Sequence, residues 1–254
     1  MKVIFIKKRG LVTIALGLVL LLTCFVGDLG QTAGAVYLAS ASRELPIYNV
    51  QTDEQKCAIS FDAAWGADKT MDIINVCNEY NVKATFFLVG FWVEENLEVA
   101  KKIVDNGFEI GLHSNTHRDL AKLSESEIRD DVQKNIDIVK TNLGIEPKLF
   151  RVPYGSYNDR VINTIRECGL QVIQWDVDSL DWKGLSAVNI AGRINSRVKQ
   201  GSIILCHNNA DNIVQALKLV FEDLKNKKLS VVPVGELIYT GDYTINNQGT
   251  QIKK

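Results

Sequence analysis

The sequence predicts an α/β fold, a distorted (β/α) barrel of about seven parallel strands preceded by one N-terminal membrane segment. Short apolar runs of strand length recur along the chain, and stretches with helical spacing of apolar residues separate most of them. This alternation predicts parallel strands joined by right-handed crossovers. A length of 254 residues suits one such barrel.

The apolar runs and the amphipathic stretches give the expected elements. We expect strands at residues 57–61, 84–89, 108–112, 148–150, 171–175, 202–206 and 230–232, and helices at 69–80, 124–143, 158–168, 187–199 and 211–227. Ser124 and Glu127 form the sequence pattern of a capping box, and Gly144 suits a left-handed helix end. A doubly wound open sheet has the same alternation and stays an alternative. No glycine-rich phosphate loop follows the first strand, which argues against nucleotide binding.

The overall composition is that of an ordinary globular protein. Hydrophobic residues make up 46% of the chain and charged residues 23%, which is enough for a full core. Lys and Arg number 29 against 30 Asp and Glu, so no basic face is expected and nucleic acid is excluded as a partner. The five cysteines form no CxxC pair and are expected to be buried apolar side chains.

The N-terminus has the pattern of a membrane segment. A basic cytoplasmic end, residues 1–10, precedes an uncharged apolar run at 11–27. As a helix this run would span about 25 Å. Its charge flanks predict a single-pass protein of the cell membrane with the rest of the chain on the extracytoplasmic side. A signal peptide cleaved near residues 39–41 is the alternative, and it would give a secreted protein.

Three further regions follow the membrane segment. Residues 28–54 are expected to be a connector, 55–238 the barrel, and 239–254 a polar tail. The tail contains no apolar periodicity, and we expect it to be partly disordered from Gly241 onward.

Chemically active side chains follow the ends of several predicted strands, where barrel active sites lie. All three histidines, His113, His117 and His207, are found there, as are Asp62 and Arg151. His113 and His117 are four residues apart and could direct both imidazoles to one divalent ion, although two unrelated polar residues would show the same spacing. A base, an acid, a metal-type pair and a guanidinium suit hydrolysis at a polarised carbonyl.

The strand-end residues also resemble a known family. The motifs are Ser60-Phe61-Asp62, His113-Ser114-x-x-His117, Arg151-x-Pro153-Tyr154-Gly155, Asp178-Ser179-x-Asp181-Trp182 and Leu205-Cys206-His207. In this order they resemble the five motifs of polysaccharide deacetylases, the NodB-homology domain of carbohydrate esterase family 4. The resemblance covers about residues 55–238, and the whole chain is most similar to the sporulation-type, PdaB-like branch.

This resemblance implies a function. It implies a monomeric hydrolase of carbon–nitrogen amide bonds that removes N-acetyl groups from cell-wall glycan, either peptidoglycan or a chitin-like polymer. The branch implies a role in maturation of the spore cortex.

The resemblance also implies roles for individual residues. Asp62 matches the catalytic base, and Arg151 matches the arginine that keeps this carboxylate ionised. His207 matches the general acid, oriented by Asp181 or, as the alternative, by Asp178.

Other positions match the metal, oxyanion and substrate contacts of the family. His113 and His117 match ligands of a divalent metal, zinc or cobalt. The backbone N–H of Tyr154 matches a donor to the tetrahedral oxyanion. Substrate contacts are expected from Trp182, Leu205 and Pro153.

One position departs from the family pattern. Ala63 stands where a second aspartate usually completes an Asp-His-His metal site, and two neutral imidazoles alone hold an ion less tightly. Asp68 could supply the missing oxygen, waters could complete a weak site, or no metal binds. The last outcome would leave slow hydrolysis or a glycan-binding and wall-maturation factor without activity.

Overall fold

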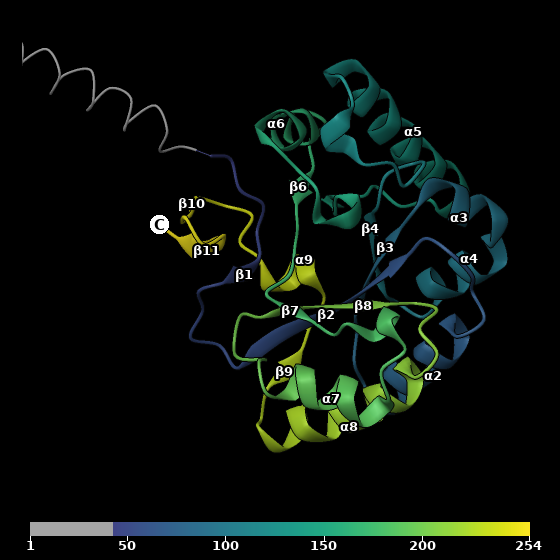
Figure 1. The fold of residues 1–254 in the computed structure, drawn as a ribbon, viewed down its shortest axis with the longest axis vertical. Helices are drawn as coiled ribbons and strands as arrows, with labels where there is room; N and C mark the ends of the chain where they lie inside the picture. Colours follow the sequence, from purple (N-terminus) through teal and green to yellow (C-terminus); the bar gives the residue numbers. More distant parts are fainter. Residues whose placement is uncertain (1–42) are drawn as a thin grey trace, which may run out of the picture. The chain divides into compact units, whose positions relative to one another are not determined.

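The centre of the fold is a sheet of parallel strands surrounded by helices (Figure 1). The computed structural model describes residues 43–254. Seven strands follow the order β6-β5-β4-β3-β2-β8-β7, and within the described residues no ladder joins β6 to β7. The predicted distorted barrel is therefore an α/β half-barrel rather than a doubly wound sheet.

The strands are short except for the central one. Their bounds are β2 (Lys56–Ala63), β3 (Thr85–Leu88), β4 (Glu109–Leu112), β5 (Leu149–Phe150), β6 (Gln171–Val172), β7 (Val177–Asp178), β8 (Ile203–His207) and β9 (Ser230–Val231), which pairs with the start of β2. Seven of the eight residues of β2 are buried, because the strand pairs on both sides and helices cover the sheet.

The helices confirm the predicted amphipathic stretches. Their bounds are α2 (Thr70–Glu79), α3 (Gly90–Glu95), α4 (Leu97–Asp105), α5 (Glu125–Leu143), α6 (Asp159–Glu167), α7 (Ala187–Asn195), α8 (Ile213–Asn226) and α9 (Val234–Leu237). Side chains of Ser124 and Glu127 form the predicted capping box on α5, and Gly144 ends that helix with φ 68°. The sequence patterns did not indicate α3 and α4, which meet at Asn96.

One predicted strand is shorter than expected, and a further strand that was not predicted follows it. The run at 171–175 was expected to be a single strand, but the chain pairs with β5 only at β6 and then crosses to the opposite edge of the sheet. There β7 pairs with β8. Each strand has two residues, too few to produce a periodic pattern.

The connector and the C-terminal tail are both ordered parts of the fold. Strand β1 (Asn49–Val50) pairs with β11 (Thr250–Lys253), which pairs in turn with β10 (Tyr243–Ile245). The buried Ile47 exchanges backbone hydrogen bonds with the β6 edge, donating to Val172 and accepting from Gln174. The expectation of a partly disordered tail is therefore wrong: pairing with a distant strand orders a segment that has no apolar periodicity of its own.

Two further sequence predictions concern the cysteines and the membrane segment. The cysteines among the described residues are free, and Cys57, Cys77 and Cys206 are buried as expected. The predicted membrane segment at 11–27 lies outside the described residues. Within residues 43–254, no helix has the length and hydropathy needed to span a bilayer.

The ordered tail gives a stability prediction. Gln251 is fully buried, and its side chain accepts from the N–H of Tyr239 at 2.8 Å and donates to the carbonyl of the same residue at 2.8 Å. Gln251→Ala should lower the free energy of unfolding in urea by about 1–3 kcal/mol, because it leaves the backbone N–H and carbonyl of the half-buried Tyr239 without these partners. The exposed Gln248 provides the matched control, Gln248→Ala. Equal stabilities of the two variants would contradict an ordered tail.

Candidate active site

A pocket of about 670 Å³ lies at the carboxyl ends of the parallel strands. Eight of the ten site residues predicted from the sequence line it: Asp62, His113, His117, Tyr154, Asp181, Trp182, Leu205 and His207. They come from five strand ends, and the parallel order of the strands brings those ends to one edge. Arg151 and Pro153 are buried and do not line the pocket.

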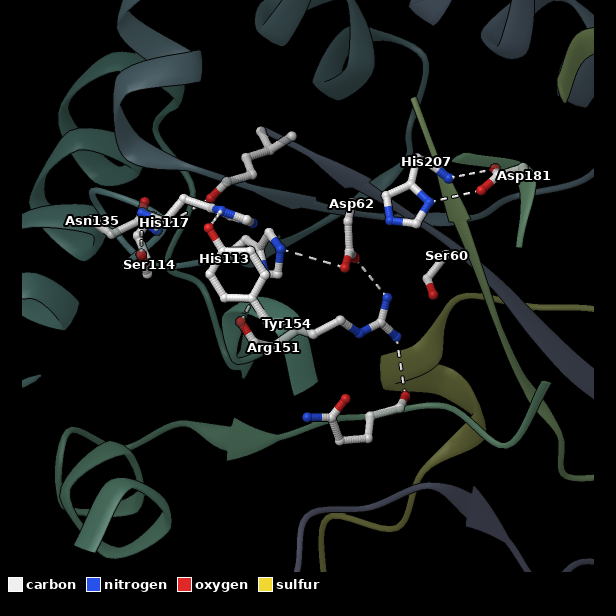
Figure 2. Close-up of polar contacts among 12 residues, drawn as sticks. Ser60, Asp62, His113, Ser114, His117, Asn135, Arg151, Tyr154, Asp181 and His207 are labelled. Carbon is white, nitrogen blue, oxygen red and sulfur yellow. Dashed lines mark hydrogen bonds and ion pairs between the residues drawn. The ribbon is translucent and has the colours of Figure 1, made fainter. Parts of the chain in front are cut away.

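The floor of the pocket is built on a buried ion pair (Figure 2). Arg151 is fully buried, and its guanidinium donates to Oδ1 of Asp62 at 2.7 Å. A second guanidinium nitrogen donates to the carbonyl of Gln174 at 3.1 Å, and the group lies 4.1 Å from the ring centre of Phe87. Burial alone would raise the pKa of Asp62, but the attraction of Arg151, His113 and His207 more than offsets this and the pKa is lowered. Asp62 is therefore a carboxylate at neutral pH.

The histidine pair lies beside this carboxylate. His113 Nδ1 donates to the backbone carbonyl of Arg151 at 2.8 Å, which turns Nε2 toward Asp62 Oδ2 at 3.4 Å. His117 Nδ1 is 3.1 Å from the hydroxyl of Tyr154. Burial, with the neighbouring His113, lowers the pKa of His117 to about 4. Burial also lowers the pKa of His113, so both imidazoles are neutral at neutral pH.

Helix α5 holds the loop that carries the two histidines. The buried Asp131 accepts from the backbone N–H of Asn115 at 2.8 Å and from the hydroxyl of Thr116 at 2.6 Å. Asn135 donates to the carbonyl of Ser114 at 2.6 Å. The sequence analysis did not predict these supports. A buried polar residue on the inner face of an otherwise apolar helix stripe is the one signal that could have revealed them.

Backbone strain is concentrated around the pocket. Of the six residues other than glycine with positive φ in the described part of the chain, four follow strands at the pocket edge: Ser114, His117, Tyr154 and Leu180. Such conformations are unfavourable for residues with a Cβ and persist where the surrounding structure fixes them. The fold therefore maintains strained loops at this edge.

His207 and Asp181 form a second polar pair across the pocket. Strand register places His207 directly opposite Asp62 on the neighbouring strand. Asp181 accepts two hydrogen bonds from His207. Its Oδ1 is 2.7 Å from ring Nδ1, and its Oδ2 is 2.8 Å from the backbone N–H. Asp178 instead accepts from the backbone N–H of Leu180. Of the two alternatives left open by the sequence, the structure pairs Asp181 with His207.

This pairing changes the protonation of His207. Burial alone would lower its pKa, but the hydrogen bond and charge of Asp181, together with Asp62 and Asp178, raise it above the ordinary value. The imidazolium is thus favoured, as a proton donor requires.

Two of the three predicted substrate contacts line the pocket, and the third does not. Trp182 is 59% exposed at the pocket wall, and Leu205 contributes a buried wall. Pro153, also predicted to contact substrate, is buried outside the pocket lining, where it begins a 3-10 turn at Pro153–Gly155. Trp65, which the sequence did not assign to a role, is 60% exposed and lines the pocket.

Comparison with known proteins identifies the family. Residues 49–173 match the family model "Polysaccharide deacetylase". Over 192 residues the chain is 32% identical to a peptidoglycan-N-acetylglucosamine deacetylase of Bacillus cereus, covering 74% of this chain and 70% of the relative. The chain belongs to the polysaccharide deacetylase family.

The chain is also similar to an uncharacterized protein and to a solved pseudoenzyme. An uncharacterized protein of Bacillus subtilis, YlxY, is 33% identical over 82% of this chain, which spans 65% of that protein's length. A solved structure described as a pseudoenzyme of carbohydrate esterase family 4 from Bacillus anthracis is 33% identical, with a TM-score of 0.74 over 76% of this chain and 68% of that one. The family fold therefore occurs both in deacetylases and in a pseudoenzyme.

The donor set of this family member falls short of a divalent metal site. Ala63 is fully buried within the apolar core and offers no ligand atom. Asp68 is exposed and outside the pocket lining, so it does not replace the missing carboxylate. Among residues 43–254, no three His, Cys, Asp or Glu side chains gather as metal ligands. Two imidazoles alone do not fit a tightly held zinc or cobalt ion.

The buried ion pair gives a stability prediction for this family member. Arg151→Met should lower the free energy of unfolding by about 3–5 kcal/mol, since it leaves the Asp62 carboxylate buried without its partner. Urea titration followed by circular dichroism measures the loss. The exposed Arg197 gives the control: Arg197→Met should stay within about 0.5 kcal/mol of the wild type. A similarly small effect at Arg151 would refute the role of the pair.

The His207–Asp181 pair gives a prediction on pH. Asp181→Asn removes the charge that stabilises the imidazolium, so the pKa of His207 should fall. NMR titration of the histidine ring protons measures this, with His207→Gln to assign the signals. Asp178→Asn, which removes a charge but no hydrogen bond to the ring, should lower the pKa less. The reverse order of the two shifts would contradict the assigned pairing.

Proposed function

We propose that this protein is an N-deacetylase of cell-wall glycan, acting on the N-acetyl groups of peptidoglycan or a related polymer. One observation carries the proposal: an ionised carboxylate, Asp62, and a histidine that favours its protonated form, His207, face one pocket from neighbouring strands. Amide hydrolysis needs these two groups together, a base for the attacking water and an acid for the departing amine.

The proposed reaction proceeds in two steps. Asp62 takes a proton from water as the water oxygen attacks the acetyl carbonyl, and the backbone N–H of Tyr154 donates to the resulting oxyanion. The carbon–nitrogen bond then breaks as His207 gives its proton to the sugar nitrogen. The products are acetate and the free amine of the sugar. Arg151 keeps Asp62 ionised, and Asp181 holds the ring of His207 in position.

The cellular setting is also a proposal. The basic end and apolar run of residues 1–27 support a single-pass membrane anchor with the barrel on the extracytoplasmic side. Resemblance to the PdaB-like branch supports a role in maturation of the spore cortex. We propose that the barrel acts there as a monomer.

A second candidate is a wall-glycan binding or maturation factor without turnover. Ala63 favours it, because the absent carboxylate removes a ligand of the Lewis acid that would polarise the carbonyl. The likeness to a pseudoenzyme supports it as well. This candidate keeps the pocket but requires no proton transfer by Asp62 or His207.

Release of acetate tests the leading proposal. The full-length protein should release acetate from N-acetylglucosamine oligomers or purified peptidoglycan, measured with and without added zinc or cobalt. Asp62→Asn should reduce the rate by about 10²–10⁴-fold, because the amide cannot accept the proton of the water. The exposed Asp68 gives the matched control, and Asp68→Asn should keep the wild-type rate.

The second candidate predicts different results. No acetate would be released from any of these substrates. In cells lacking the protein, Asp62→Asn and His207→Ala would then restore the wild-type phenotype as well as the wild-type protein does. Failure of a normally folded Asp62→Asn variant to complement would refute the binding-only role.

A further inference from the structure

The exposed aromatic surface of the described chain is concentrated at one place. Among residues 43–254, the large hydrophobic side chains that are strongly exposed are Trp65, Met71, Tyr154, Trp182, Val188 and Leu219. The three aromatic ones all line the active-site pocket, and the three aliphatic ones all lie outside it. Exposed aromatic surface gathered at a pocket marks a place where a ligand is bound.

The backbone beside Trp65 is anchored by hydrogen bonds, although the Trp65 side chain is exposed. The carbonyl of the next residue, Gly66, accepts from the indole N–H of Trp92 at 2.7 Å and from the side chain of Asn208 at 2.9 Å. Gly66 has φ +64°, and a Cβ there would lie 2.4 Å from the side chain of Asn209. The loop is thus fixed from α3 and from the end of β8, so a ligand that stacks on Trp65 does not have to order it.

Trp65 and Tyr154 both contact the ring of His117. The ring centre of Trp65 is 4.5 Å from that of His117, with the planes at 74°, and Tyr154 is 4.7 Å away with the planes at 70°. Both contacts are edge-to-face, and most of each outer ring remains exposed, 60% for Trp65 and 66% for Tyr154. Two exposed aromatic side chains therefore contact the predicted metal-ligand histidine.

The charges of the pocket limit the chemistry of the ligand. Four carboxylate side chains line it, from Asp62, Asp178, Asp181 and Asp211, and none of its described lining residues is Lys or Arg. Arg151 and His207 pair with Asp62 and Asp181, and the charges of Asp178 and Asp211 would repel a uronic acid or other anionic sugar. A neutral or amino-bearing sugar would find acceptors for its hydroxyls in these carboxylates and in the amides of Asn208 and Asn209.

We propose that Trp65, together with Tyr154, forms a stacking subsite that binds a neutral hexosamine ring of the glycan beside the catalytic pair. A sugar ring has apolar C–H faces and a polar hydroxyl rim, which match an aromatic surface bordered by carboxylates and amides. Trp65 lies two residues after Ala63, so the segment that lacks the metal carboxylate supplies a sugar-binding surface instead. The inference rests on the proposed function only in taking wall glycan as the ligand.

Binding of an N-acetylglucosamine tetramer to the full-length protein tests the subsite. Isothermal titration calorimetry gives the Kd, and acetate is measured in the recovered sample. Trp65→Ala should weaken binding at least about tenfold, Trp65→Phe should retain most of it, and Leu219→Ala, an exposed position on α8 outside the pocket, should bind like the wild type. A tetragalacturonate should bind more weakly than the neutral tetramer.

If the tetramer is hydrolysed, the comparison is made through KM, which Trp65→Ala should raise with a smaller change in kcat.

The outcomes separate the subsite from the proposed reaction. Trp65-dependent binding without acetate supports the subsite and contradicts the deacetylase. Acetate release with an affinity that Trp65→Ala leaves unchanged overturns the subsite and supports the deacetylase. A wild-type protein that does not bind the tetramer at millimolar concentration overturns the subsite. Thermal unfolding of each variant confirms that the exposed substitution has left the fold intact.

Discussion

The ion pair between Asp62 and Arg151 is the interaction on which the site depends. It joins the end of β2 to the residue after β5, and the same arginine is bonded to the chain after β6 through the carbonyl of Gln174. Its own carbonyl accepts from His113 after β4. A charged pair this deeply buried is stable only while both partners are present, since either charge alone would be strongly unfavourable there. Four strand ends are thereby held in fixed relation around one carboxylate.

The second constraint is the register of β2 and β8. Because Asp62 and His207 are direct neighbours on parallel strands, the proposed base and acid meet without any loop having to place them. Their environments then separate their proton affinities. A guanidinium stabilises the ionised form of Asp62, and a carboxylate stabilises the protonated form of His207. Partners of opposite charge thus favour the ionised form of Asp62 and the protonated form of His207, which are the forms that the proposed base and acid of amide hydrolysis require.

Ala63 changes the chemistry of the site without changing this framework. The two histidines remain in place, supported from α5 by Asp131 and Asn135, yet the third ligand is a buried methyl group. Proton transfer by Asp62 and His207 needs no atom of Ala63, whereas polarisation of the carbonyl by a metal would. The exposed Trp65 lies two residues after Ala63. The proposed sugar binding and proton transfer therefore use no atom of the missing metal ligand.

The sequence by itself determined the alternation of strands and helices, the capping of α5 and the positions of Asp62, His113 and His207 at strand ends, because these depend on local periodicity and on short motifs. It could not determine that Asp181 rather than Asp178 bonds His207, that Pro153 is buried away from the pocket, or that Asp68 faces solvent. Those outcomes depend on loop conformations fixed by contacts between distant segments.

The ordered tail and the aromatic surface of Trp65 and Tyr154 were decided in the same way, because only the folded chain determines which backbone groups pair and which aromatic rings stay exposed.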